Sequence, residues 1–206
     1  MKKIILFLAF VLSVQFSMAQ AYKVGDKASD FRLKNVDGQW VSMADYPEAK
    51  GFIIVFTCNH CPYSRAYETR INNIAVRYKP LGYQLIAINP NDSTIVAADS
   101  YSKMQLRAKA RSFHFPYLLD DHQRYAKIYG ATRTPQVFLL QKQEGGLIVR
   151  YTGAIDDNYE DPMEVSQRFL QAALNALIHG KQAVPNTTKA IGCSIKYAGA
   201  SQKKTP

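Results

Sequence analysis

Two cysteines separated by two residues form the part of this sequence best suited to chemistry. Cys58 and Cys61 follow the apolar run of residues 52–56, and Pro62 comes directly after them. The run is typical of a buried strand, and proline is favoured in the first turn of a helix, so both thiols lie where a strand passes into a helix. Unpaired N–H groups and the helix dipole favour a thiolate there. The spacing predicts a redox-active Cys58–Cys61 disulfide that exchanges with other thiols.

The two cysteines are expected to have different roles. Cys58, at the exposed edge, attacks as a thiolate, and Cys61, screened by the helix, resolves the mixed disulfide. A partly protonated His60 would lower the pKa of Cys58 and stabilise the reduced form, which makes the pair more oxidising. The alternative for His60 is a solvent-facing turn residue.

A second element of the expected site is Thr134-Pro135, at the start of the apolar run 136–140. A cis bond here would turn the Thr134 backbone toward the thiols and leave its N–H and C=O groups free to pair with an extended substrate. The alternative is an ordinary trans proline that opens a strand.

Other uses of these cysteines fit the sequence less well. A zinc site needs four ligands, and Cys58, Cys61 and His60 or Cys193 lack the usual paired spacing. Haem attachment needs a histidine after the second cysteine, where Pro62 stands. A purely structural disulfide remains an alternative, although so short a loop constrains the unfolded chain little. We expect no bound metal and no other cofactor.

The elements that must position these residues follow from apolar periodicity and turn residues. Asp37-Gly38 between apolar segments predicts a hairpin, and an apolar face predicts a helix from Pro62 to about residue 78. A last helix is expected to begin at Asp161-Pro162 and to end at Gly180. The other expected elements are strands at 52–56, 83–88, 136–140 and 147–152, helices at 100–112 and from Asp120 or Asp121 to about 129, and an extended piece at 113–119. This order predicts an α/β fold with a mixed sheet flanked by helices.

The chain ends are expected to lie outside this domain, which spans residues 22–180. Residues 1–19 have the basic start, apolar core and small residues of a secretory signal peptide, with cleavage after Ala19 or after Ala21. We therefore expect an exported protein, periplasmic or extracellular in a bacterium, with no stable membrane insertion after cleavage. Residues 181–206 are polar and are expected to form a loosely ordered tail. The net charge of +10 is spread along the chain, so no nucleic-acid partner is expected.

The motifs together resemble the thioredoxin fold. The segment 24–38 resembles the N-terminal hairpin of the redoxin branch, which includes AhpC/TSA-like peroxiredoxins and exported TlpA/ResA-type oxidoreductases. A narrower likeness, to peroxiredoxin-like CxxC proteins of the thioredoxin family, covers residues 22–197. It runs through the segments 56–63, 88–92, 115–117, 134–135, 155–158 and 189–196. The resemblance implies a thioredoxin-like fold, a CxxC redox site and thiol or disulfide groups of proteins as partners.

Departures from the family pattern leave some roles open. Phe52 stands where thioredoxin has the acid that relays a proton to the second cysteine, and Asp92 is our candidate substitute. Arg133 is either a source of positive potential at the thiols or a solvated loop residue. Cys193 is either a resolving thiol or a tail thiol tied down locally. The peroxidase pattern of a Thr or Ser three positions before the reactive cysteine is missing, since Val55 stands there.

The sequence thus predicts an exported thiol–disulfide oxidoreductase that exchanges electrons with protein thiols or disulfides and with a redox donor or acceptor protein. A peroxiredoxin-like thiol peroxidase is the second hypothesis. The third is a non-catalytic thioredoxin-fold module that uses the site for a metal such as copper or for a partner protein.

Overall fold

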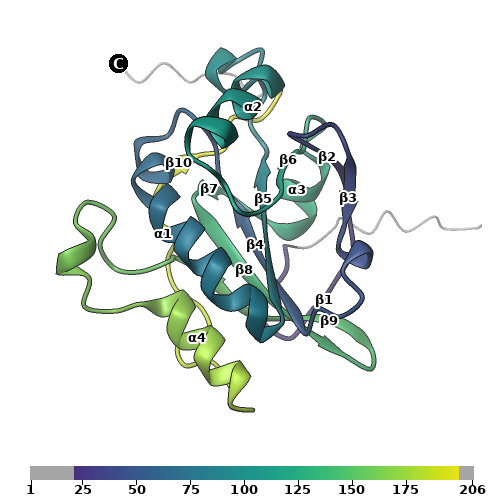
Figure 1. Cartoon of the computed structure of the whole chain (residues 1–206), viewed down its shortest axis with the longest axis vertical. Coiled ribbons are helices and arrows are strands. Elements are labelled where there is room, and N and C mark those ends of the chain that lie inside the picture. The colour runs from purple at the N-terminus through teal and green to yellow at the C-terminus, as the bar shows by residue number, and fades with distance from the viewer. Residues whose placement is uncertain (1–20, 200–206) are drawn as a thin grey trace, which may run out of the picture.

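The computed structural model describes residues 21–199, and its centre is a mixed sheet of eight strands in the order β1-β9-β8-β4-β5-β6-β2-β3 (Figure 1). β4 pairs parallel with β5 and antiparallel with β8, so the sheet is mixed, as predicted. The strands of this sheet are β1 Lys27–Ala28, β2 Arg32–Asn35, β3 Trp40–Ser42, β4 Gly51–Phe56, β5 Tyr83–Asn89, β6 Tyr117–Leu119, β8 Gln136–Gln143 and β9 Gly146–Gly153. A separate two-stranded sheet joins β7 (Arg133–Thr134) to β10 (Cys193–Ser194).

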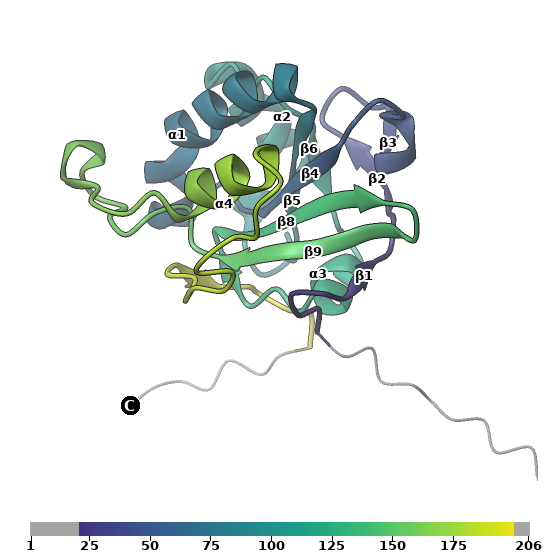
Figure 2. The ribbon, with the colours of Figure 1, turned by 90° about the horizontal axis from the view of Figure 1, so that it is seen from below.

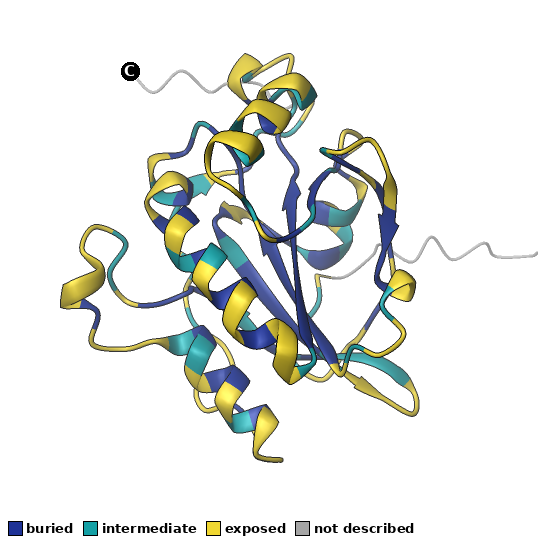
Figure 3. Cartoon of the chain, viewed as in Figure 1, coloured by how far each residue is buried: buried dark blue, intermediate teal, exposed yellow. Residues whose placement is uncertain are grey.

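The central strands β4 and β5 are buried along their whole length (Figure 3). Side chains alternate across a strand, so Ile53 and Val55 enter one apolar cluster while Ile54 and Phe56 enter the other. Because both faces of the sheet are covered, β4 needs apolar residues at every position. This explains the unbroken apolar run that leads to Cys58.

Helices cover both faces of the sheet (Figure 2). Side chains of α1, α2 and α4 join the first apolar cluster, and side chains of α3 join the second. The helices are α1 Pro62–Tyr78, α2 Tyr101–Ala110, α3 Arg124–Tyr129 and α4 Phe169–Ile178. The expected layers of the α/β fold are therefore confirmed.

The last helix begins later than the sequence predicted. Residues Pro162–Glu164 form only a 3₁₀ turn, and α4 starts at Phe169. Asp157 holds the segment between them: its carboxylate accepts the Ser166 N–H at 3.1 Å, and its own N–H donates to the Gln167 carbonyl at 3.1 Å. These bonds hold residues 166–167 outside a helix, so α4 begins only after them.

The expected N-terminal hairpin is present as β2 and β3. Gly38 has a φ of +91°, in the left-handed region that favours glycine. β2 also pairs with β6, so the hairpin extends the central sheet at its β6 edge. The redoxin-type start of the fold is confirmed.

The expectation of a loosely ordered tail is wrong for residues 181–199. Thr187 forms a parallel bridge with Thr152, β10 pairs with β7, and Ile195 is buried. These contacts tie the segment after α4 to the domain. The predicted signal peptide and residues 200–206 lie outside the described residues. Between residues 21 and 199, no helix has the length and apolar character to cross a bilayer.

Candidate active site

Both thiols of the Cys-x-x-Cys segment lie at the junction of β4 and α1, as the sequence predicted. Cys61 is the N-cap residue of α1, and Pro62 occupies the first turn. Cys58 and Cys61 are both free thiols, which corresponds to the reduced state of the pair. Cys58 is only 3% exposed and Cys61 is fully buried, so the expectation of an exposed first sulfur is wrong.

Thr134 contacts both thiols from β7. Its hydroxyl lies 3.3 Å from the Cys58 sulfur, and its carbonyl oxygen accepts a hydrogen bond from the Cys61 thiol at 3.1 Å. The Thr134–Pro135 bond is cis. The sequence predicted that the backbone groups of Thr134 would be free to pair with a substrate. This edge is occupied, because β10 pairs with Thr134.

His60 lies beside Cys58 and a buried acid that the sequence analysis missed, Asp99. The His60 Nδ1 atom is 3.5 Å from the Cys58 sulfur and 2.6 Å from the Asp99 carboxylate. Since an ionised carboxylate only accepts hydrogen bonds, this contact fixes the imidazole proton at Nδ1. The side chain of His60 remains 26% exposed. His60 is thus oriented by an acid and is not a free turn residue.

Asp99 also anchors the backbone of the Cys-x-x-Cys loop. Its Oδ1 atom accepts the N–H groups of Asn59 at 2.6 Å and His60 at 3.3 Å. Its Oδ2 atom accepts from the Asn91 side chain at 2.8 Å. Asp99 is fully buried, and charge-assisted hydrogen bonds of this kind are the strong ones. The acid therefore holds both intervening residues of the loop in place.

The position of Asp99 follows from the sheet. β4 and β5 are parallel neighbours, so the segments after their carboxyl ends lie at the same edge. The Cys-x-x-Cys loop follows β4, and residues 90–99 follow β5. This topology could have pointed to an acid between residues 90 and 99, but the sequence alone did not separate Asp99 from Asp92.

The two thiols titrate as one unit because each acts on the pKa of the other. The interaction with Cys58 lowers the pKa of Cys61 to about 4. The interaction with Cys61, together with burial and the charge of Asp99, raises the pKa of Cys58 well above its usual range. Contacts with Thr134 act in the opposite sense, since its carbonyl accepts from a Cys61 thiol and its hydroxyl can donate to a Cys58 thiolate. We therefore expect the reduced pair to hold one proton and one negative charge near neutral pH.

We expect the reduced protein to hold one thiolate over a wide pH range. The first ionisation lies far below that of a free thiol and the second far above it, so a plateau of one thiolate should extend from about pH 6 to about pH 9. The thiolate should disappear as the pH falls through about 4. Absorbance at 240 nm, reduced minus oxidised protein, measures this. A single rise near the pKa of free cysteine would contradict the coupled titration of the two thiols.

The remaining candidates from the sequence lie in different places. The Asp92 carboxylate accepts from the Thr94 N–H and hydroxyl, and within residues 21–199 it makes no hydrogen bond to either thiol. Arg133 donates to the carbonyl of Gly192 at 3.3 Å, and its charge acts on Cys193. Cys193 lies opposite Thr134 in the β7–β10 pair. Arg133 and Cys193 therefore belong to the site, and Asp92 caps a turn.

Cys58, His60 and Asp99 also place three atoms capable of binding a metal within 4.8 Å of one another. Both Asp99 oxygens already accept hydrogen bonds from the loop and from Asn91. A cation would have to compete with these donors for the carboxylate. The donor set therefore fits the positioning of the loop and His60 better than the binding of an ion.

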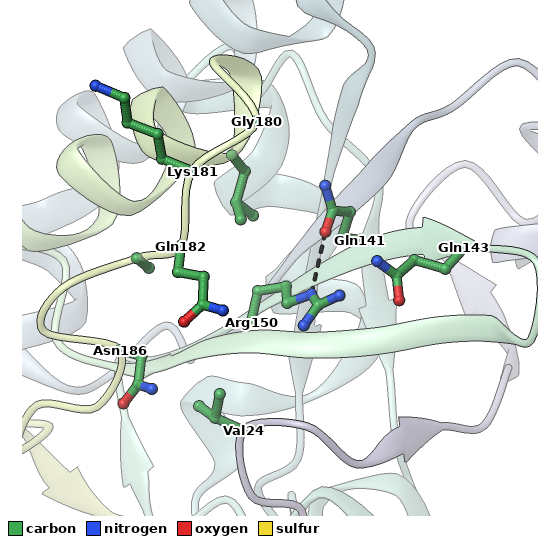
Figure 4. A pocket seen from close by; sticks show the side chains of 10 residues that line it. Val24, Gln141, Gln143, Arg150, Gly180, Lys181, Gln182 and Asn186 are labelled. Atoms are coloured by element: carbon green, nitrogen blue, oxygen red, sulfur yellow. Dashed lines mark hydrogen bonds between the residues drawn. The ribbon is translucent and has the colours of Figure 1, made fainter.

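A separate pocket, lined by Gln141, Arg150 and Gln182 among others, lies away from the thiols (Figure 4). Gln141 and Gln143 belong to the half of β8 near its turn to β9, whereas Gln136 marks the end of β8 next to Thr134. This pocket takes no part in the thiol site.

Comparison with known proteins agrees with the site and the fold. The sequence model of the AhpC/TSA family matches residues 24–158, which is more than half of the chain. The chain belongs to the AhpC/TSA family. The match ends before α4 and the tail. Membership confirms the resemblance to redoxins and the thioredoxin-like fold.

One curated relative and two solved structures also resemble this chain. A curated relative named thiol-disulfide oxidoreductase ResA, from Bacillus thuringiensis subsp. konkukian, is 23% identical over 73% of this chain and 86% of its own length. The crystal structure of an uncharacterized conserved protein from Geobacillus kaustophilus is 33% identical, with a TM-score of 0.79 over 87% of this chain and 94% of its own. A hypothetical protein from Sinorhizobium meliloti 1021 is 29% identical, with a TM-score of 0.80 over 87% of this chain and 97% of its own. These likenesses and the redoxin domain confirm the expected enzyme class, an oxidoreductase.

Proposed function

We propose that this AhpC/TSA family member is an exported thiol–disulfide oxidoreductase that exchanges electrons with protein thiols and disulfides through Cys58 and Cys61. The observation that carries the proposal is the convergence of both thiols on Thr134 at the N-terminus of α1. The ResA relatives support the reaction. The signal-like residues 1–19 support export to the periplasm or the cell exterior.

Cys58 is the attacking thiol in this proposal. It lies next to His60, whose side chain is part of a groove lined also by Arg65, Lys103 and Leu106. Cys61 is fully buried behind it and is therefore suited to resolve the mixed disulfide. As Cys58 attacks, it can pass its proton to Cys61, whose pKa is the lower of the two. The pair thereby supplies its own first proton acceptor, in the absence of the acid that Phe52 replaces.

The surroundings of the pair suggest the chemistry of its partners. Arg65 and Lys103 give the groove beside His60 a positive lining, and Leu106 is an exposed apolar residue on it. Such a surface favours client segments with acidic and apolar side chains. A client that also pairs with Thr134 must displace β10 from β7, because both would use the same strand edge.

Replacement of Cys58 or Cys61 by Ser tests the proposal. Each single variant should reduce insulin disulfides no faster than the uncatalysed reaction, because Cys58 is needed to attack the client and Cys61 to resolve the mixed disulfide. Gly145→Ala, a change in open space at the β8–β9 turn, is the folded control and should keep full activity. A wild-type protein without exchange activity would contradict the proposal.

The two alternative functions predict different results for the reduced wild-type protein. A thiol peroxidase requires the reduced wild type to react with hydrogen peroxide much faster than free cysteine does, which stopped-flow fluorescence would measure. A metal-binding module requires a tight copper complex that weakens in Cys58→Ser, without insulin reduction. Either result would overturn the assignment of the pair to thiol–disulfide exchange.

A further inference from the structure

The tail after α4 follows a fixed course to the thiol site. Thr188 first ties it to β9: its N–H donates to the Thr152 carbonyl at 3.0 Å, and its hydroxyl accepts the N–H of Ala154 at 3.0 Å. Beyond β10, the Ile195 N–H donates to the Thr132 carbonyl at 3.2 Å and the Lys196 N–H donates to the Asn91 side chain at 2.8 Å. The segment around Cys193 is therefore anchored on both sides (Figure 1).

This course brings a third thiol to the pair. Cys193 stands directly opposite Thr134 in the antiparallel β7–β10 pair, and residues directly opposite each other present their side chains to the same face. Thr134 directs its hydroxyl toward Cys58 on that face, at 3.3 Å. The Thr134 carbonyl accepts from the Cys61 thiol at 3.1 Å, and Cys193 lies close enough to Cys61 for each thiol to act on the pKa of the other. Three thiols thus surround one residue, Thr134.

The close approach of the tail depends on a small residue before Cys193. A Cβ atom on Gly192 would lie 2.2 Å from the Thr134 carbonyl oxygen and 3.1 Å from the Pro135 nitrogen. Arg133 holds the Gly192 carbonyl from the other side, at 3.3 Å. The backbone next to Cys193 is therefore packed against the site and not merely near it.

The charges around Cys193 change with the redox state of Cys61. Burial, and then the contact with Cys61, raise the pKa of Cys193 to about 11, while Lys196 and Arg133 lower it. Once Cys61 is part of a disulfide, it carries no charge and its contribution to the rise is lost. The cations Lys196 and Arg133 remain, so Cys193 ionises more readily in the oxidised protein than in the reduced one.

We propose that Cys193 is a third redox-active thiol that forms a disulfide with Cys61 after the Cys58–Cys61 pair has been oxidised. In this step the Cys193 thiolate attacks the Cys61 sulfur of the Cys58–Cys61 disulfide. The Cys61–Cys193 bond forms, the Cys58–Cys61 bond breaks, and Cys58 leaves as a thiolate. The proton of Cys193 passes to water, and no further oxidant is consumed.

The consequence is a separation of roles within the oxidised protein. Cys58 becomes a free thiol again while the disulfide is stored between Cys61 and the tail. The disulfide also links β10 covalently to the N-terminus of α1, so the tail stays closed over Thr134 until Cys61–Cys193 is reduced. This inference rests on the proposed exchange at Cys58 and Cys61 and adds a second disulfide to it.

Mapping the disulfides of the oxidised full-length chain tests the proposal. The reduced wild type and Cys58→Ser are oxidised with glutathione disulfide, quenched with acid, alkylated, digested and analysed by mass spectrometry. The wild type should contain both Cys58–Cys61 and Cys61–Cys193, and Cys58→Ser should form Cys61–Cys193 as its main product. In Cys61→Ser, a Cys58–Cys193 bond should be at least about ten-fold less abundant, since disulfide formation requires close approach and Cys61 is the thiol that acts on Cys193.

A matched control moves the third thiol by one residue. Cys193→Ser combined with Ser194→Cys keeps three cysteines but places the thiol on the opposite face of β10, because side chains alternate along a strand. This double variant should not form a disulfide between Cys61 and residue 194. A disulfide there, or a Cys58→Ser protein whose Cys61 carries only glutathione, would overturn the proposal.

Insulin reduction by the wild type distinguishes a failure of the Cys193 proposal from a failure of the proposed oxidoreductase function. An active wild type whose oxidised form contains only Cys58–Cys61 refutes the role of Cys193 and leaves the oxidoreductase intact. A wild type that forms Cys61–Cys193 but reduces no protein disulfide refutes the proposed function instead.

Discussion

Replacement of Asp99 by Asn is expected to make the Cys58–Cys61 pair a stronger oxidant and to lower the free energy of unfolding of the protein. After the interaction with Cys61 and burial, the Asp99 charge is the next cause that raises the pKa of Cys58, and so it opposes negative charge on the pair. Without this charge the thiolate, and with it the reduced state, is favoured. A disulfide whose reduced form is more stable is more oxidising. Its potential rises by about 30 mV for each unit by which the thiol pKa falls.

The stability loss in Asp99→Asn has a separate cause. The carboxylate accepts hydrogen bonds through both oxygens, from Asn59 and His60 on one side and from Asn91 and His60 on the other. An amide offers one accepting oxygen, and its NH₂ group would face donors. Leaving buried donors unsatisfied costs about 1–3 kcal/mol. Urea unfolding of the reduced protein measures this loss.

Equilibration with reduced and oxidised glutathione measures the expected change in potential. Asp121→Asn is the matched control, because it removes the same charge from a side chain that is 62% exposed. The control should change neither the potential nor the stability beyond a few tenths of a kcal/mol. A potential for Asp99→Asn that equals the wild-type value would contradict the electrostatic role of Asp99.

Asp99 also illustrates what the sequence could predict. The apolar run before Cys58, Pro62 after Cys61 and the Thr134-Pro135 pair carry local patterns, and each lies where those patterns predict. The role of Asp99 depends on the pairing of β4 with β5, which brings it into contact with residues 39 and 40 positions away. No local pattern marks such an acid, since the buried Asp99 and the half-buried Asp92 look alike in the sequence.

The prediction of a loosely ordered tail is wrong for a related physical reason. Residues 181–199 are rich in polar and small residues, and such a composition predicts loose order when a segment is considered alone. Their order comes instead from backbone hydrogen bonds to β9 and β7 and from the burial of Ile195. Tertiary partners of this kind leave no periodicity in the segment itself, so Gly192 and Cys193 could not be placed from the sequence.

The substitution Gly192→Ala should open the thiol site. The added Cβ would meet the Thr134 carbonyl oxygen at 2.2 Å and its carbon at 2.7 Å, and these are backbone atoms that cannot rotate away. The tail must therefore shift, and overpacking of this kind costs about 1–3 kcal/mol. If that cost acts on the closed state alone, the open fraction rises about 5- to 150-fold. Alkylation of Cys58 by iodoacetamide, followed by peptide mass spectrometry, should accelerate by the same factor.

The matched control for Gly192→Ala is Gly145→Ala, the same change at a position with no atom within 4 Å of the added carbon. It should leave the alkylation rate unchanged. An unchanged rate in Gly192→Ala as well would mean that reagents reach Cys58 through the groove beside His60, with β10 still paired to β7. A faster rate would mean instead that the paired tail limits access, and that clients able to replace β10 on Thr134 reach the thiols fastest. The size of the client would then matter: protein disulfides should gain more from Gly192→Ala than glutathione does, because only an extended chain competes for the strand edge.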